Sequence, residues 1–511
     1  MNELLVQLSQ LGPQLADHVL LSASAIALGI ALALPLAVWA SRSPPVARIA
    51  LGFASLVQTI PALALLALFF PLLLALRAVF GSDLPTLGFL PAWLALALYA
   101  LLPILRNAVT AQANIDPGAI EAADGVGMTG WQKLRLVEAP LSAPYVMAGI
   151  RTASVWTIGA ATLATTIGQR SLGDPIFAGL QTQNWVLVLA GCIASAGLAL
   201  VADALFGLVE RGLATRNRLL TLAGLGIALA GIAAAFVATS GGNRDTVVVG
   251  AKNFSEQYIL ARLIGDRLED AGYAVEYRQG LGSAVIHGAL TSGAIDVYVD
   301  YSGTVWANAM HRDEPLPRGE MIDAITRWEE ETTGTLVMGT LGFENAYAFA
   351  MRPERAAQLN IGSLADLAPL SPSLVAGGDV EFFERPEWMR VRDAYGLDFA
   401  RLRNFTATFM YDALQSGEAD VISAFSSDGR IAADRLVVLE DPRQALPGYD
   451  ALLLVAPERA GDADFLNALR PLIGAIPVEA MREANYSVDR MEDKRTPAQA
   501  AEALEALVEP E

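Results

Sequence analysis

The 511-residue sequence has a single cysteine, Cys192, and only three histidines. One cysteine excludes a framework of intrachain disulfides. His18, His287 and His311 do not have the spacing of metal ligands. No G-x-x-x-x-G-K-[ST] motif is present, so we expect any ATP hydrolysis to come from another chain. No nucleophile–base or metal constellation of an enzyme is present either, and we expect no cofactor and no metal.

Positive charge is scarce in the second half of the chain. Residues 1–244 carry 12 Lys and Arg against 10 Asp and Glu, whereas residues 245–511 carry 23 against 44. The acidity argues against nucleic acid as a partner, because phosphate would be repelled. It suits a cationic ligand, although most of these charges are expected to be solvated surface groups. The N-terminus lacks the basic segment and cleavage site of a secretory signal.

Long apolar runs dominate the first half. Six are long enough to cross a bilayer, which takes about 20 residues. They lie at residues 18–41, 48–76, 88–111, 145–168, 185–209 and 219–239. Pro61 and Pro71 predict a break or kink in the second run. Asp203, near the inner end of the fifth run, is the clearest ionisable group, expected to be functional or paired.

The loops give the orientation. Lys and Arg concentrate after the first, third and fifth runs, so these loops are predicted to face the cytoplasm. An even number of spans then returns the chain to the outer side. We therefore expect residues after about 240 to lie outside the cytoplasm, tethered by the sixth span.

The second half alternates strand and helix patterns. Residues 246–254, 273–281 and 294–304 read as strands, and 255–272 and 282–293 as helices, with Ser255 as a plausible N-cap. Such alternation predicts a parallel sheet with ligand chemistry at the strand carboxyl ends. In the third strand, Val297 and Val299 are expected to be buried. Asp300, on the other face, is expected to be a structural or surface group.

One cytoplasmic loop carries a motif. Residues 121–140 read EAADGVGMTGWQKLRLVEAP, which resembles the coupling loop of ABC importer permeases. Such a loop forms a short helix-turn-helix that docks on a separate ATPase, and its glycine permits the turn. The motif falls on Glu121, Ala122, Ala123, Gly127 and Pro140. The segments QTIPALALLALF, LYALLPILRNAV and GIRTASVWTIGAATLATTIG are similar to permeases of quaternary-amine and osmoprotectant importers.

The second half resembles the binding proteins of the same importers. KNFSEQ, QGLGS, AIDVYVDYSGT, GFENAYAF, FSSDGRI and LPGYDA occur in that family's order. The resemblance implies an all-α polytopic permease domain, residues 1–240, and a linker, 241–245. It also implies an α/β two-lobed periplasmic-binding-protein fold over 246–511. One lobe would comprise about 246–340 and 447–511, and the other about 341–446, closing on ligand in the cleft.

The family's ligands are glycine betaine, choline, carnitine and relatives, so a site for trimethylammonium is expected. Aromatic faces attract such a diffuse cation. The resemblance places an aromatic box on Tyr301, Tyr347, Phe425 and Tyr449. Polar contacts to the ligand's other end are expected from Gln257 and Thr304.

Two charged residues extend the expected site. Glu344 departs from the neutral residue common in its motif, and its carboxylate could pair with a cationic or N–H-bearing group. Arg430 could hold a ligand carboxylate bidentately or pair with Asp428. Ergothioneine importers share this fused layout, and ergothioneine is a trimethylated histidine betaine with a thione-bearing imidazole ring. It stays open beside the simple betaines.

These features predict a permease plus substrate-binding subunit in a bacterial inner membrane. Its partners would be the bilayer, a cytoplasmic ABC ATPase, a quaternary ammonium solute and a second copy forming a homodimeric pore. A solute receptor is the alternative, but no signalling output region is present. A membrane-anchored enzyme and a secondary transporter fit the motifs less well.

Overall fold

The computed structural model describes residues 2–81, 84–182, 184–239, 246–312, 314, 316–379, 382–443, 445–490 and 492–508. The chain divides into two compact units. The first comprises residues 1–177 and 186–242, and the second residues 178–185 and 243–511. The predicted linker, residues 241–245, lies outside the described residues.

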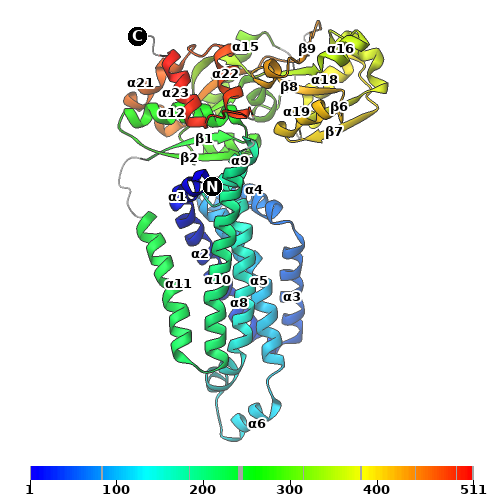
Figure 1. The fold of residues 1–511 in the computed structure, drawn as a ribbon. Helices are drawn as coiled ribbons and strands as arrows, with labels where there is room; N and C mark the ends of the chain where they lie inside the picture. Colours follow the sequence, from blue (N-terminus) through cyan, green and yellow to red (C-terminus); the bar gives the residue numbers. More distant parts are fainter. Residues whose placement is uncertain are drawn as a thin grey trace. The chain divides into compact units, whose positions relative to one another are not determined.

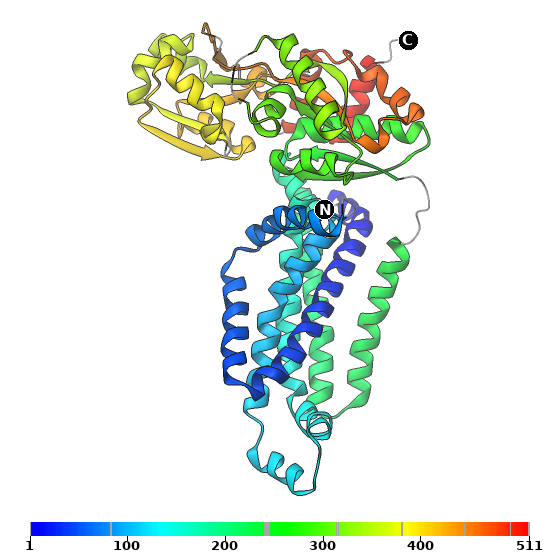
Figure 2. The ribbon, with the colours of Figure 1, turned by 180° about the vertical axis from the view of Figure 1, so that it is seen from behind.

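The first unit is built from helices throughout its described residues. They are α1 (Asn2–Gln10), α2 (Gly12–Arg42), α3 (Pro44–Thr59), α4 (Ala62–Phe80), α5 (Phe89–Ala113), α6 (Pro117–Gly125), α7 (Gly130–Lys133), α8 (Ala139–Ala161), α9 (Asp174–Gln181), α10 (Trp185–Ala214) and α11 (Arg218–Thr239). Helices α2, α5, α8, α10 and α11 run alongside one another (Figures 1 and 2). Helix α5 lies centrally, in contact with α2, α3, α4 and α8. Its buried face is rich in alanine, which lets neighbouring helices approach closely in a membrane.

Four helices of the described chain, α2, α5, α10 and α11, are long and apolar enough to cross a membrane. A fifth span arises if α3 and α4 count as one, but the pair bends by 103°. The predicted break at Pro61 is therefore confirmed, since this residue directly precedes α4, whereas Pro71 lies within it. The predicted fourth span falls on α8 and a 3₁₀ turn, Thr162–Ile167, outside that set. The count of six stays a prediction.

Asp203 is paired, as one of the two expectations stated. Its carboxylate accepts two hydrogen bonds from Arg151, from Nε at 2.6 Å and from Nη2 at 2.7 Å. Glu210 adds a third contact to the same guanidinium at 3.3 Å. The three groups join α8 to α10, so the described contacts give Asp203 a role in helix packing.

The second unit contains two five-stranded sheets. The first has the order β2-β1-β3-β10-β4 and the second β7-β6-β8-β5-β9. The strands are β1 (Thr246–Lys252), β2 (Ala274–Leu281), β3 (Val297–Tyr301), β4 (Leu336–Glu344), β5 (Tyr347–Met351), β6 (Val375–Asp379), β7 (Arg401–Phe405), β8 (Val421–Phe425), β9 (Val437–Leu439) and β10 (Asp450–Val455). The chain passes between the sheets twice, from β4 to β5 and from β9 to β10, as expected for two lobes joined by crossing segments.

Helices cover both sheets. Those in the part of the chain that forms the first sheet are α12 (Ser255–Asp270), α13 (Ser283–Thr291), α14 (Ser302–Thr304), α15 (Arg318–Trp328), α21 (Ala463–Leu469), α22 (Val478–Asp489) and α23 (Pro497–Val508). The second sheet has α16 (Pro353–Leu359), α17 (Leu364–Leu367), α18 (Pro386–Tyr395), α19 (Ala407–Ser416) and α20 (Arg430–Ala433). Helix α12 packs on β1, β2 and β3 with a buried stripe of leucine and isoleucine.

Two expectations for this unit need correction. The sheets are mixed rather than parallel, because β10 runs antiparallel to β3 and β4, and β5 runs antiparallel to β8 and β9. Each of these strands follows a crossing and returns against its sheet. Ser255 is not the N-cap of α12. Phe254 holds that position, and the Ser255 hydroxyl donates to Asp489 at 2.5 Å.

Candidate functional site

Strand register brings the four rings of the aromatic box together. Tyr347 begins β5 and pairs directly with Phe425 at the end of β8. Directly opposed side chains on antiparallel strands lie close together. Tyr301 ends β3 opposite Ala451 of β10, so Tyr449, just before β10, reaches the same place. The backbone N–H of Asn345 donates to the Tyr449 carbonyl at 2.8 Å and ties the crossing segments together.

All four rings line one cavity of about 170 Å³. The Tyr347 ring centroid lies 5.0 Å from that of Phe425 and 5.6 Å from that of Tyr449. Tyr301 stacks on Phe254 at 6.2 Å. The predicted contact Thr304 also lines the cavity. The other described lining residues considered below are Lys252, Asn253, Phe254, Ser283, Asn345, Asp379, Arg385 and Thr406.

The Tyr301 hydroxyl is held from below the ring. It donates to the Glu256 carboxylate at 2.5 Å and accepts from Gln257 Nε2 at 3.0 Å. Burial, with the nearby Glu256 carboxylate, raises the pKa of Tyr301 well above its ordinary value, so the phenol stays protonated. Gln257 also donates to the Val299 carbonyl and does not line the cavity. Its amide therefore supports Tyr301 from within the core.

Tyr449 is fixed in a different way. Its hydroxyl donates to the Glu387 carboxylate and accepts from Arg385 Nη2 at 3.4 Å. A Cβ placed on Gly303 would lie 2.5 Å from Cζ of the Tyr449 ring. Glycine at position 303 is thus required for the ring to lie flat against the Ser-Gly-Thr turn.

Charged side chains lie beside the rings. Asp300 is buried and accepts from Lys252 Nζ at 2.5 Å and from the Tyr298 hydroxyl at 2.6 Å. The structural alternative for this residue is correct and the surface alternative is wrong, because all five residues of β3 are buried. Lys252 lines the cavity with its ammonium 5.2 Å from the Tyr301 ring centroid. Arg385 lies 5.5 Å from the Tyr347 ring centroid.

Two predicted residues lie away from this cavity. Glu344 ends β4 and lines neither this cavity nor the smaller one described below. Arg430 lines only the smaller cavity, where it takes its structural alternative. Its Nε and Nη2 contact the two carboxylate oxygens of Asp428 at 3.0 and 2.6 Å.

The motifs missed several residues of the site. Arg385 and Asp379 belong to a stretch for which no motif was recognised. Lys252 and Phe254 belong to, or directly adjoin, the quoted segment KNFSEQ, yet only the following glutamine was selected. Their position at the carboxyl end of β1 was the available signal, because ligand sites in such sheets form at strand ends.

The predicted coupling loop, in the first unit, forms short helices around a turn. Helix α6 carries Glu121 to Ala123, and Gly127 adopts a left-handed conformation with φ of +76°. Helix α7 starts at a capping box formed by Thr129 and Gln132. A π-helical turn, Leu134–Glu138, leads into α8, whose first turn holds Pro140. Val126 and Trp131 are 73% and 70% exposed, so this loop presents apolar side chains.

Comparisons with known proteins cover both units. A family model described as the substrate binding domain of ABC-type glycine betaine transport systems matches residues 245–504. A second, the binding-protein-dependent transport system inner membrane component, matches residues 25–215.

Curated relatives have the same organisation. The chain is 30% identical over 448 residues to an ergothioneine transport permease/ergothioneine binding protein of Helicobacter pylori, covering 84% of this chain and 78% of the relative. It is 40% identical to a glycine betaine/carnitine/choline permease of Bacillus subtilis, covering 41% of this chain and 94% of the relative. It is 28% identical to a carnitine transport binding protein of Listeria monocytogenes, covering 49% and 83%.

Proposed function

Because the chain belongs to the family of ABC importer subunits that fuse a permease to an osmoprotectant-type substrate-binding domain, we propose that it captures a quaternary ammonium solute and conducts it inward. ATP hydrolysis on a separate chain drives the transport. The permease places the protein in the inner membrane, with the binding domain on the extracytoplasmic side.

The aromatic box is the observation that carries the ligand class. A trimethylammonium group has no N–H to donate and spreads its charge over the methyl groups. The negative faces of Tyr301, Tyr347, Phe425 and Tyr449 attract such a cation within about 6 Å of a ring centroid. The four rings line one cavity, and a tyrosine hydroxyl network holds two of them in place.

Arg385 and Thr304 are assigned to the other end of the solute. Arg385 lines the cavity beside Tyr347 and Tyr449, within reach of a carboxylate attached to the bound cation. A guanidinium suits that group because its donors match both carboxylate oxygens. Gln257 is assigned to positioning Tyr301. Glu344 is assigned no ligand contact, since it lines neither cavity.

Ergothioneine is the second candidate solute. The Helicobacter pylori relative named for ergothioneine matches most of this chain, across both the permease and the binding domain. Relatives named for betaine, carnitine and choline match one domain each. Ergothioneine carries the trimethylammonium and carboxylate of a betaine, so the aromatic box and Arg385 serve both candidates.

The coupling loop is assigned to the ATPase. Its exposed Val126, Trp131 and Leu136 offer an apolar surface of the kind that protein partners cover. One copy supplies about half the helices of a pore with twofold symmetry, so the permease is proposed to act as a homodimer with two ATPase copies. Two tethered binding domains raise the local solute-loaded concentration at the pore.

Binding by the full chain in lipid nanodiscs tests the ligand class. Calorimetric titration with glycine betaine, choline, carnitine and ergothioneine is expected to give saturable heat for at least one compound. No heat with any of the four would refute the proposal.

Uptake tests the coupling assignment. Glu121→Lys is expected to abolish uptake in cells that depend on this chain while leaving solute binding unchanged, because Glu121 is exposed on α6. Glu354→Lys, an equally exposed change on α16, is the matched control and should leave both intact. Normal uptake by Glu121→Lys would remove the loop from the mechanism.

A further inference from the structure

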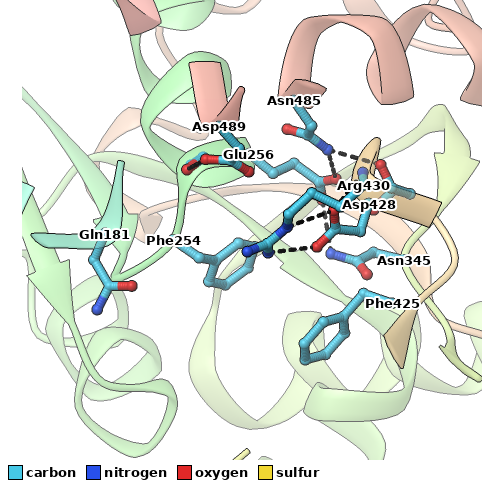
Figure 3. Close-up of a pocket in the computed structure, with 11 residues that line it drawn as sticks. Gln181, Phe254, Glu256, Asn345, Phe425, Asp428, Arg430, Asn485 and Asp489 are labelled. Atoms are coloured by element: carbon cyan, nitrogen blue, oxygen red, sulfur yellow. Dashed lines mark hydrogen bonds and ion pairs between the residues drawn. The ribbon is translucent and has the colours of Figure 1, made fainter. Parts of the chain in front are cut away.

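A second cavity of about 70 Å³ adjoins the aromatic box and shares Phe254, Asn345 and Phe425 with it. We name it the side chamber. Its remaining walls include Glu256, Asp428, Arg430, Asn485 and Asp489, which project toward one another in Figure 3. Its volume exceeds what one water molecule needs, so a small polar group fits inside.

Glu256 organises the side chamber. Its buried carboxylate accepts from the Tyr301 hydroxyl at 2.5 Å, from Asn345 Nδ2 at 3.0 Å and from Asn485 Nδ2 at 2.9 Å. Burial raises its pKa, and these hydrogen bonds oppose the rise. A carboxylate flanked by three donors acts as an acceptor, which fixes the nitrogen of both amides toward it.

The same contacts turn both amide oxygens away from Glu256. Asn345 and Asn485 are 7% and 4% exposed, and both line the side chamber. Within the part of the chain that the structure describes, neither Oδ1 has a hydrogen-bond partner. A buried carbonyl oxygen left without a donor costs free energy, and almost all such groups in folded proteins are satisfied. These oxygens therefore await donors from outside the chain.

The charged groups in the chamber favour the same kind of guest. Asp489 adds a buried carboxylate, which accepts from the Ser255 hydroxyl. Arg430 is the cation among the described walls, and its guanidinium holds Asp428 through two hydrogen bonds. Acceptor oxygens thus dominate the inner surface. A carboxylate entering the chamber would meet like charge, whereas an N–H or O–H group would find acceptors.

We propose that the side chamber is a subsite for an N–H- or O–H-bearing group on the same solute whose trimethylammonium group occupies the aromatic box. The inference rests on the proposed function and names a second recognition element of that site. Glu256 joins the two subsites, because one carboxylate holds Tyr301 of the box and both chamber amides. Solutes with a donor at the far end gain contacts that glycine betaine cannot make.

Asn485→Leu tests the proposal, because Asn485 lines the side chamber but not the aromatic-box cavity. The full chain in nanodiscs is titrated with ergothioneine, which carries ring N–H groups, and with glycine betaine and tetramethylammonium, which carry none. Asn485→Leu is expected to weaken ergothioneine about tenfold, equivalent to about 1.4 kcal/mol. The other two affinities are expected to change less than about threefold. Asn467→Leu, on an exposed face of α21, is the matched control.

The outcomes separate the inference from the proposed function. An unchanged ergothioneine affinity, or an equal loss for all three ligands, overturns the side-chamber proposal alone. Absence of binding by the wild type to all three ligands overturns the proposed function. A ligand-side comparison covers a variant that fails to fold. Ergothioneine methylated on both ring nitrogens should bind the wild type no more tightly than glycine betaine, and undiminished affinity would refute the subsite.

Discussion

Tyr301 combines a ring that faces the solute with a hydroxyl that faces the core, and two substitutions separate these roles. Tyr301→Phe keeps the ring and removes the hydroxyl that Glu256 and Gln257 hold. Tyr301→Ala removes both. If the box binds the cation through its rings, affinity should follow the ring and stability should follow both groups.

The magnitudes come from the contacts. Losing one desolvated cation–π contact costs up to about 2 kcal/mol, so Tyr301→Ala should weaken solute binding by about tenfold to thirtyfold. Tyr301 is 4% exposed, and truncating such a buried ring costs about 3–5 kcal/mol of stability. Tyr301→Phe should cost about 1–3 kcal/mol, because Gln257 keeps its bond to Val299 and Glu256 keeps two amide donors. Its affinity should stay within about threefold of the wild type.

Calorimetry on the nanodisc-embedded chain measures the affinities, and thermal unfolding measures stability, at about 2–4 °C for each kcal/mol. Equal loss of affinity in the two variants would refute the reasoning, since it would mean that the hydroxyl rather than the ring contacts the solute. Unchanged affinity in Tyr301→Ala would remove this ring from the box.

Two other predictions concern the neighbourhood of the box. Gly303→Ala should weaken binding more than about tenfold, because its Cβ would collide with the Tyr449 ring, whereas Gly319→Ala, with open space around its Cβ, should bind normally; equal affinities would contradict the packing argument. Burial raises the pKa of Asp489 from 3.8 to about 6, opposed by the charge of Arg430. The folded state therefore binds this proton more tightly, and the resulting stability is present at low pH and lost as the pH rises through about 6. Thermal midpoints measured from about pH 4 to pH 8 should show the wild type losing stability relative to Asp489→Asn up to about pH 6 and levelling above it; a constant difference would contradict the shift.

Periodicity and motifs gave much of the architecture. Strand and helix patterns in the second half located β1, α12, β2, α13 and β3 to within a few residues of their bounds. Long apolar runs coincide with α2, α5, α10 and α11. These elements are local, because repeating apolar positions and turn residues lie within one segment. Strand direction is not local, which is why antiparallel β10 and β5 escaped prediction.

The site divides along the same line. Tyr301, Tyr347, Phe425 and Tyr449 were selected by motif, and the structure places them around one cavity. Arg385 could not be selected, since only the fold brings α18 to the box. Burial was also hidden, because Asp300 looks like a surface acid until β3 is seen at the centre of its sheet beside Lys252. The amide orientations around Glu256 depend on residues more than 200 positions apart in the chain.

A structure of the full chain with saturating solute tests the central claim most directly. The account predicts the quaternary nitrogen within about 6 Å of the ring centroids of Tyr301, Tyr347, Phe425 and Tyr449. A solute found with its cation outside these rings, for example beside Glu344, would contradict it.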